Sequence, residues 1–288
     1  MKTKIAVGCL LLGLCICGCG PRQPRARHVI LIGIDTMSAR GIQHAGTPCL
    51  NHLVENGAVS LHTRCIRDTA GRENWMSMVS GAPIEMHGVN NNGRQSGDVL
   101  PALSNAEGQF PTVFDQIRAQ RPYLKQYAFI DGKDETSLYD MDAFDLSYVY
   151  GIDSTLREPG DVIRQAFDTY LQDRPEVLFL SMDLTDPFDA LLDDFVQTLE
   201  ARDWMKNTVI LITADHNDKY GHGSDTVADY EVPVILYGKG VTKGKVMKRT
   251  NMVYDVAATV AGLLGVKLPW ECRGKFLSEA FEPADGGR

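Results

Sequence analysis

The stretch that decides the fold is Thr208-Val-Ile-Leu-Ile-Thr-Ala-Asp-His216. Its apolar, mostly β-branched run from Val209 to Ile212 predicts a fully buried strand. The strand ends in Asp215 and His216, which place an oxygen donor beside a nitrogen donor. In open α/β sheets, ligands bind just beyond the carboxyl ends of such strands. We therefore expect a functional site at this end of the strand.

A second stretch, His28-Val-Ile-Leu-Ile-Gly-Ile-Asp35, has the same design of a buried strand followed by a carboxylate. Another histidine, His222, lies in the short Gly-His-Gly sequence after the first stretch. Together, Asp35, Asp215, His216 and His222 predict a mixed oxygen and nitrogen cluster suited to zinc or a similar divalent ion. The alternative is that Asp215 and His216 only terminate a strand.

The rest of the chain alternates between predicted strands and predicted helices. Further strands are expected over 127–130, 177–181 and 232–237. Helices are expected over 74–79, 111–119, 161–171, 188–199 and 255–264, and another is expected to open at Thr47-Pro48. Asp161 is predicted as an N-cap, and Gly265 is predicted to close the last helix. This alternation predicts an α/β fold with a mostly parallel central sheet sandwiched by helices.

Composition places the chain among ordinary globular proteins. Of the 288 residues, 44% are hydrophobic and 23% are charged, which is typical of soluble domains. The net charge of −8 argues against nucleic acid as a partner. No linker divides residues 28–281, so we expect one domain there and a disordered tail over 282–288.

The first residues have the features of a signal peptide. Lys2 and Lys4 precede an apolar run over 5–17, which is too short for a confident bilayer span. Ile16-Cys17-Gly18-Cys19 resembles the bacterial lipobox, which implies removal of residues 1–18 and lipidation of Cys19. Residues 19–27 would then be a linker, and the protein would be anchored to a membrane of the cell envelope, facing the periplasm or the exterior. An ordinary cleaved signal and a retained anchor are the alternatives.

Three cysteines remain beyond this segment: Cys49, Cys65 and Cys272. An odd number in a compartment that permits disulfides leaves two readings open. Cys49 and Cys65 form a bridge, or all three are free and buried.

An ordered set of short motifs resembles the alkaline phosphatase superfamily, particularly its phosphodiesterase/nucleotide-pyrophosphatase and sulfatase-like branches. The motifs are Gly-Ile-Asp35, Thr47-Pro48-Cys-Leu50, Ser80-Gly81, His87-Gly88-Val89, Thr213-Ala-Asp-His216 and His222-Gly223. The resemblance runs from about residue 28 to about residue 281. It implies a pair of metal ions that clamp the oxygens of the reacting group. It also implies a Thr, Ser or modified Cys nucleophile on one of those ions.

By this resemblance, Asp35, Asp215 and His216 form one metal site with the nucleophile. The position that corresponds to the nucleophile is Gly71, which has no side chain to attack with. Thr69, two residues upstream, is the candidate replacement. Asn74 occupies the place of a phosphate ligand at a helix N-terminus. Arg72 would add a positive group for the substrate, or it is a solvated surface residue.

The second metal site is also incomplete. Asp183-Leu-Thr-Asp186 resembles the start of the ligand segment, but the Gly-His that should follow is absent. Asp186 and His222 alone would make a two-ligand site, which is poor for zinc. We expect the other histidines not to replace the missing ligand; these are His44, His52, His62 and His87. One divalent ion, most simply zinc, is therefore expected, with two as the alternative.

These features predict a metal-dependent hydrolase of phosphate or sulfate esters on a lipid-anchored envelope protein, with a weakened active site. The expected partner is an anionic small-molecule ester. The alternative is a non-catalytic descendant that binds an anionic ligand or a partner protein through the same cleft, and loss of the nucleophile favours it. In a third reading, the cluster only ties strand ends together.

Overall fold

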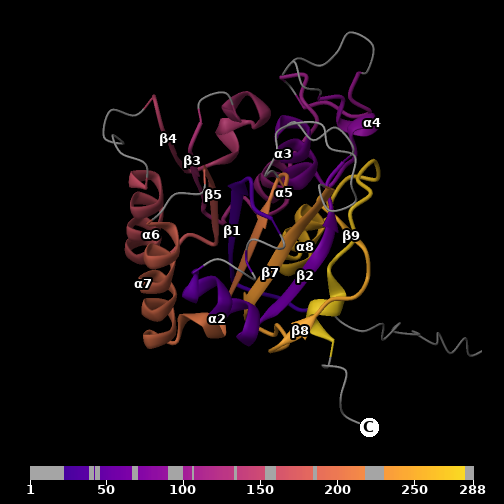
Figure 1. The fold of residues 1–288 in the computed structure, drawn as a ribbon. Coiled ribbons are helices and arrows are strands. Elements are labelled where there is room, and N and C mark those ends of the chain that lie inside the picture. Colours follow the sequence, from indigo (N-terminus) through magenta and orange to yellow (C-terminus); the bar gives the residue numbers. More distant parts are fainter. Residues whose placement is uncertain are drawn as a thin grey trace, which may run out of the picture.

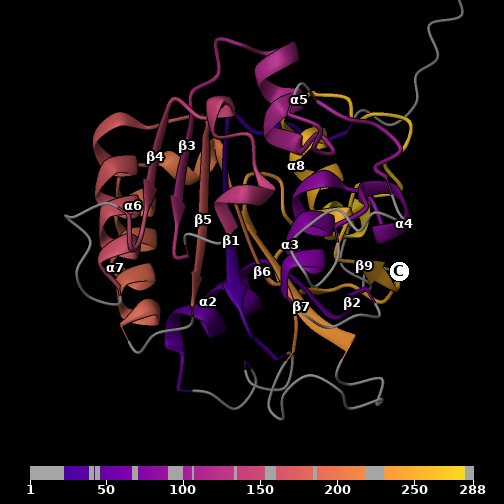
Figure 2. The ribbon, with the colours of Figure 1, turned by 90° about the horizontal axis from the view of Figure 1, so that it is seen from above.

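A computed structural model places a nine-stranded sheet at the centre of the residues that it describes (Figure 1). Those residues are 23–38, 42, 46–66, 71–89, 100–105, 107–132, 135–152, 160–183, 187–217 and 230–282. Helices cover both faces of the sheet, which confirms the predicted α/β class (Figure 2).

The strands are β1 (His28–Asp35), β2 (Ala58–Arg64), β3 (Gln126–Ile130), β4 (Leu146–Val149), β5 (Val177–Asp183), β6 (Thr208–Ala214), β7 (Glu231–Gly238), β8 (Lys245–Val246) and β9 (Asn251–Met252). Their order in the sheet is β4-β3-β5-β1-β6-β7-β2-β8, with β9 beside β2. Strands β4, β3, β5, β1 and β6 are parallel, whereas β7 is antiparallel to both of its neighbours. The expected mostly parallel sheet is therefore confirmed.

Two layers of helices enclose the sheet. The helices are α2 (Pro48–Asn56), α3 (Gly71–Ser80), α4 (Ile84–His87), α5 (Val113–Gln120), α6 (Asp161–Asp173), α7 (Phe188–Ala201) and α8 (Asp255–Leu264). Buried side chains of α3, α5 and α8 share one apolar core, and those of α2, α6 and α7 share another. Figures 1 and 2 accordingly show α6 and α7 on one side of the sheet and α3, α5 and α8 on the other.

Strand β1 shows why the apolar runs in the sequence are nearly continuous. Val29 and Leu31 face the core that contains α3, whereas Ile30 and Ile32 face the core that contains α2. Both faces of the strand are thus shielded from solvent, so neither tolerates polar residues. At Gly33 the ring of Trp75 from α3 packs directly on the backbone. A Cβ at this position would lie 2.3 Å from the ring and would clash with it.

Two sequence expectations about helix starts were wrong. The N-cap of α6 is Gly160, with φ of 94°, and Asp161 is the first helical residue. Asp161 instead places a carboxylate in the first turn, where the helix dipole favours it. Helix α3 begins at Gly71 rather than at Asn74. The prediction started too late because the first residues of the helix are glycine and polar residues, which do not contribute to an apolar pattern.

The cysteine question is also answered. Cys49, Cys65 and Cys272 are free thiols, the first two of them buried. Burial raises the pKa of Cys49 to about 12 and that of Cys272 to about 12, so neither is a ready thiolate.

The predicted signal peptide, Cys19 and residues 283–288 of the predicted tail lie outside the described residues. Among the residues that are described, no helix is both long enough and apolar enough to cross a membrane.

Candidate metal centre

Two neighbouring parallel strands end side by side at the predicted site. Strands β1 and β6 pair in register up to Ile34 opposite Ala214. Asp35 and Asp215 follow these partners, and His216 comes next. One ligand atom from each of Asp35, Asp215 and His216 lies within 4.8 Å of the others. The structure therefore brings together three of the five predicted metal ligands.

Asp215 is the buried member of this group, with 0% of its surface exposed. Its Oδ1 accepts hydrogen bonds from the backbone N–H groups of His216 (2.8 Å) and Thr36 (3.4 Å). Its Oδ2 is buried and has no hydrogen-bond partner among the residues that the structure describes. Burial raises the pKa of Asp215 to about 7, although His216 partly opposes the shift. A buried carboxylate oxygen without a partner is costly unless a proton or a cation meets it.

Asp35 and His216 complete a set of donors around that oxygen. His216 Nε2 lies 3.1 Å from Asp35 Oδ1 and 3.6 Å from Asp215 Oδ2. The hydrogen bond with His216 lowers the pKa of Asp35, against the opposing effect of burial. The Asp35 side chain is 43% exposed, so the group is open to solvent on this side. Two carboxylates and an imidazole are donors that suit zinc, and the free Oδ2 shows that these residues fit such an ion.

Gly71 lies against the same oxygen. It is the first residue of α3, and a Cβ built on it would be 2.9 Å from Asp215 Oδ2. The position that the family resemblance assigns to the nucleophile is therefore next to the candidate metal ligands, but the residue there is glycine, which has no side chain. The N-terminus of α3 also lies here, and the helix dipole favours an anion at this end.

The two predicted substrate-binding residues have other contacts. Asn74 is fully buried, and its Oδ1 accepts a hydrogen bond from the backbone N–H of Ile66 at 2.9 Å. Arg72 donates from Nη2 to Ser137 Oγ at 2.6 Å. Both lie in the first turn of α3, close to Gly71. Their role in binding a substrate remains a prediction.

Three predicted site residues, Thr69, Asp186 and His222, lie outside the described residues, as does His44. The remaining histidines do not join the cluster. His62 contacts Glu231 at 3.1 Å on the surface. His52 lies 3.7 Å from Glu200, and His87 is buried beside Ser77.

Two acids near the cluster were not predicted as site residues. Asp183 ends β5 in register with Asp35, and Glu135 accepts a hydrogen bond from Ser181 Oγ. Burial raises the pKa of Glu135 to about 8, with further contributions from Asp215, Asp35 and Asp183. The raised pKa favours the protonated form of Glu135, which can donate its proton. Asp183 had a sequence signal, since it ends a predicted strand, whereas nothing in its segment marks Glu135.

The buried histidine His87 gives a testable dependence of stability on pH. Its Nδ1 accepts the N–H of Val89 (3.1 Å), so Nε2 carries the proton and donates it to Ser77 Oγ (2.9 Å). Burial lowers the pKa of His87 to about 3. The unfolded chain binds this proton near pH 6.5, so stability is full above that pH and falls towards pH 3. One such proton contributes a slope of about 1.4 kcal/mol per pH unit.

We expect His87→Gln to reduce the slope of unfolding free energy against pH between 4.5 and 6, measured by urea denaturation. His62→Gln, which changes an exposed histidine, is the matched control and should leave the slope unchanged. An unaltered slope in His87→Gln would contradict the assignment of a neutral buried imidazole.

Comparison with known proteins identifies the family of this chain. The family model described as Sulfatase matches residues 119–266, and the model described as Type I phosphodiesterase / nucleotide pyrophosphatase matches residues 29–118. Because the first match covers slightly more than half of the chain, the protein belongs to the sulfatase family of the alkaline phosphatase superfamily. Members of this superfamily hydrolyse phosphate or sulfate esters and generally depend on divalent metals.

Individual relatives are more distant. A phosphopentomutase of Clostridioides difficile (strain 630) is 35% identical over 83 residues, which is 28% of this chain and only 20% of that protein. The fold is similar to that of the phosphonate monoester hydrolase of Silicibacter pomeroyi, with a TM-score of 0.66, 13% identity, and coverage of 90% of this chain and 78% of the other. It is also similar to murine ectonucleotide pyrophosphatase/phosphodiesterase 5, with a TM-score of 0.64, 13% identity, and coverage of 84% and 96%.

Proposed function

We propose that this protein is a metal-dependent hydrolase of phosphate or sulfate esters with a weakened active site. The observation that carries the proposal is the free Oδ2 of Asp215, which is buried among donors from Asp35 and His216. A structural strand cap would leave no reason for an unsatisfied buried carboxylate oxygen. A cation at this place would remove that cost.

The residues around the cluster suit an anionic ester. A zinc-like ion would supply Lewis-acid polarisation and lower the pKa of a nearby water. The N-terminus of α3 at Gly71 offers backbone N–H groups to a phosphate or sulfate. Glu135, with a pKa raised to about 8, holds a proton that a leaving group would need.

A specific observation favours a second candidate function. Gly71 stands where the family resemblance places the nucleophile, and it offers no hydroxyl. Loss of such a group costs several powers of ten in rate. The alternative is therefore a non-catalytic protein that binds an anionic ligand or a partner protein through the same cleft.

Metal stoichiometry and turnover test the proposal together. We expect elemental analysis of the purified protein to find about one zinc-like ion per chain, because the described residues supply three ligands and water can complete a tetrahedron. Hydrolysis of aryl phosphate, phosphodiester and aryl sulfate should be slow and should stop on chelation. One ion without any turnover would select the non-catalytic alternative. Absence of bound metal would contradict the hydrolase proposal and favour the reading in which the cluster only ties strand ends together. Two ions would reveal a further ligand.

The second part of the proposal is a lipid anchor on Cys19 that holds the protein at a membrane of the cell envelope. Its support is the lipobox-like Ile16-Cys17-Gly18-Cys19. Two acyl chains give stable attachment where one does not. We expect Cys19→Ala to move the protein from the membrane fraction to the soluble fraction when the membranes are washed at high salt, which removes protein that is held by charge alone. Cys17→Ala, one residue from the lipobox glycine, is the control and should remain membrane-bound. Equal membrane recovery of Cys19→Ala and wild type would refute the anchor.

A further inference from the structure

The edge of the sheet where the parallel strands begin carries an excess of positive charge. We call it the basic edge and define it by the segments 23–27, 121–125, 174–176, 202–207, 239–244 and 265–267. These segments contain only two acids, Glu176 and Asp203. Their cations are Arg25, Arg27, Arg121, Lys125, Arg174, Arg202, Lys206, Lys239, Lys243 and Lys267. Such an excess is unusual in a chain with a net charge of −8.

Backbone contacts hold several of these segments together. The N–H of Arg27 donates to Asn207 O, and that of Lys239 donates to Thr208 O. Arg121 Nη2 donates to Gly265 O at 3.3 Å. Three acids near these segments have partners: Asp145 pairs with Arg118 at 2.8 Å, Asp173 accepts a hydrogen bond from Tyr127 Oη at 3.0 Å, and Glu200 accepts one from Tyr237 Oη. The cations therefore form one surface rather than a scatter along the sequence.

The opposite edge has the opposite charge. The described carboxyl ends of the parallel strands carry Asp35, Asp131, Asp183 and Asp215. The molecule is thus electrically polarised along its strands. An anionic surface would attract the basic edge and repel the acidic one.

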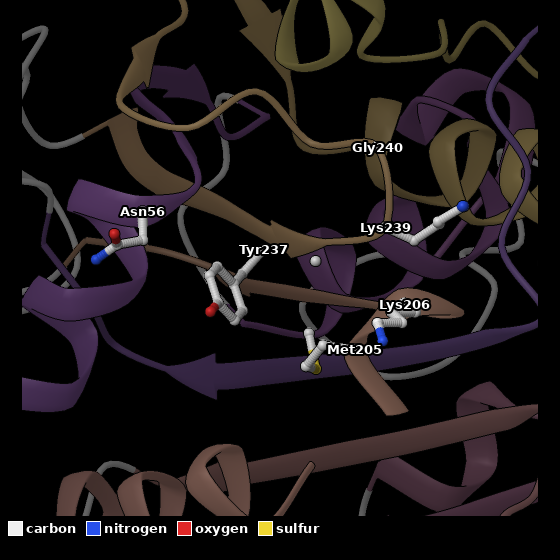
Figure 3. Close-up of a pocket in the computed structure, with 7 residues that line it drawn as sticks. Asn56, Met205, Lys206, Tyr237, Lys239 and Gly240 are labelled. Carbon is white, nitrogen blue, oxygen red and sulfur yellow. The ribbon is translucent and has the colours of Figure 1, made fainter. Parts of the chain in front are cut away.

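The basic edge also has a hollow and aromatic groups. Figure 3 shows the hollow, of about 400 Å³, with Lys206 and Lys239 among its lining residues and Tyr237 and Met205 beside them. Half-buried Trp204 contacts two guanidinium groups, 3.9 Å from its ring centroid to that of Arg174 and 4.9 Å to that of Arg202. Tyr123 is 69% exposed. Exposed aromatic residues among cations are typical of surfaces that lie at a bilayer interface.

The start of the described chain is the argument for a membrane as the occupant of this surface. Gln23 leads into β1 at the basic edge, and Cys19 precedes it by four residues. Four residues span at most about 14 Å. A lipid on Cys19 would therefore hold the bilayer within that distance of the basic edge.

We propose that the basic edge docks on an anionic membrane surface, so that the candidate metal centre faces away from the bilayer. The position of the membrane in this proposal rests on the lipid anchor argued above. The attraction to the membrane rests on the charges of the basic edge. Strand β1 has eight residues, which at a rise of about 3.3 Å each separate the metal centre from the membrane by about 26 Å. The site would then receive soluble substrates rather than lipid headgroups.

Vesicle binding by the Cys19→Ala chain tests the docking without the lipid. We expect this protein to sediment with vesicles that contain phosphatidylglycerol and phosphatidylcholine, and to be released at high salt. Vesicles of phosphatidylcholine alone measure any uncharged contribution from residues 1–18. Lys125→Glu with Lys239→Glu should lower the partition coefficient on anionic vesicles roughly tenfold or more.

The matched control is Arg164→Glu with Arg273→Glu, which changes the net charge equally but lies outside the basic edge. It should stay within about twofold of the parent protein, because screening weakens distant charges. An equal loss in both double variants would overturn the proposal, as would equal binding to neutral and anionic vesicles. These outcomes do not involve metal content or turnover, so they are distinct from failure of the hydrolase proposal. They are likewise distinct from failure of the anchor, which is read from fractionation of the unlipidated variant.

Discussion

Replacing Asp215 by Asn is expected to abolish stabilisation by metal while making the metal-free protein more stable at pH 8. The carboxylate is fully buried with its Oδ2 unpartnered, and its pKa is raised to about 7. For a raised carboxyl pKa, stability is full below the unfolded value of 3.8 and falls as pH rises towards 7. Asparagine removes that cost, which is on the order of a few kcal/mol at pH 8.

The measurement is thermal unfolding with and without zinc at pH 5 and pH 8. For the wild type, a metal concentration of about 100 times Kd should add about 2.7 kcal/mol, and Asp215→Asn should gain nothing. Asp131→Asn, which changes an acid after β3, three strands away from β6 in the sheet, is the control and should keep the metal response. A metal response that survives in Asp215→Asn would show that the ion binds elsewhere. Equal metal-free stability of Asp215→Asn and wild type at pH 8 would show that burial of the ionised Asp215 carboxylate does not lower stability.

The second large effect is expected from Gly71→Ser, which should raise turnover of aryl phosphate in the metal-loaded protein roughly tenfold or more. The new hydroxyl would lie at the start of α3, beside the candidate metal ligands. The required Cβ is close to Asp215 Oδ2, at 2.9 Å, so the carboxylate must shift by a few tenths of an ångström. The φ angle of Gly71 is not in the left-handed region, so the backbone accepts a side chain.

Gly71→Ala is the matched control, because it adds the same Cβ without the hydroxyl. Its turnover should not exceed that of the wild type, and Thr69→Ala should change little. If Gly71→Ser and Gly71→Ala behave alike, the position is not the nucleophile site. Brisk wild-type hydrolysis that disappears in Thr69→Ala would instead identify Thr69 as the nucleophile.

The sequence predicted the parts of the fold that depend on long apolar runs. Strands β1, β5 and β6 are buried on both faces. Their sequences are therefore short continuous apolar runs, which predict a buried strand. Strand β2 was missed because Ser60, His62 and Arg64 interrupt its apolar residues. Strands β8 and β9 have two residues each, which is too short for any period to be visible.

The candidate site was predictable where its residues follow strands directly. Asp35, Asp215 and His216 needed only the rule that strand ends gather ligands. Glu135 could not be found in this way, since its nearness to the cluster depends on how a 3-10 turn after β3 packs against Ser181. The contact of Asn74 with Ile66 is another long-range detail that no local pattern records.

The pairing of β1 with β6 has a consequence for how the site tolerates mutation. Odd-numbered residues of both strands, Val29, Leu31, Val209 and Leu211, face the side of α3, and so do the odd-numbered Asp35 and Asp215. Deleting one residue from either strand would reverse this parity and turn its aspartate towards the other core. Exchange of one aliphatic residue for another would preserve it. The chemistry of the centre is therefore encoded less in the identities of the core residues than in their number.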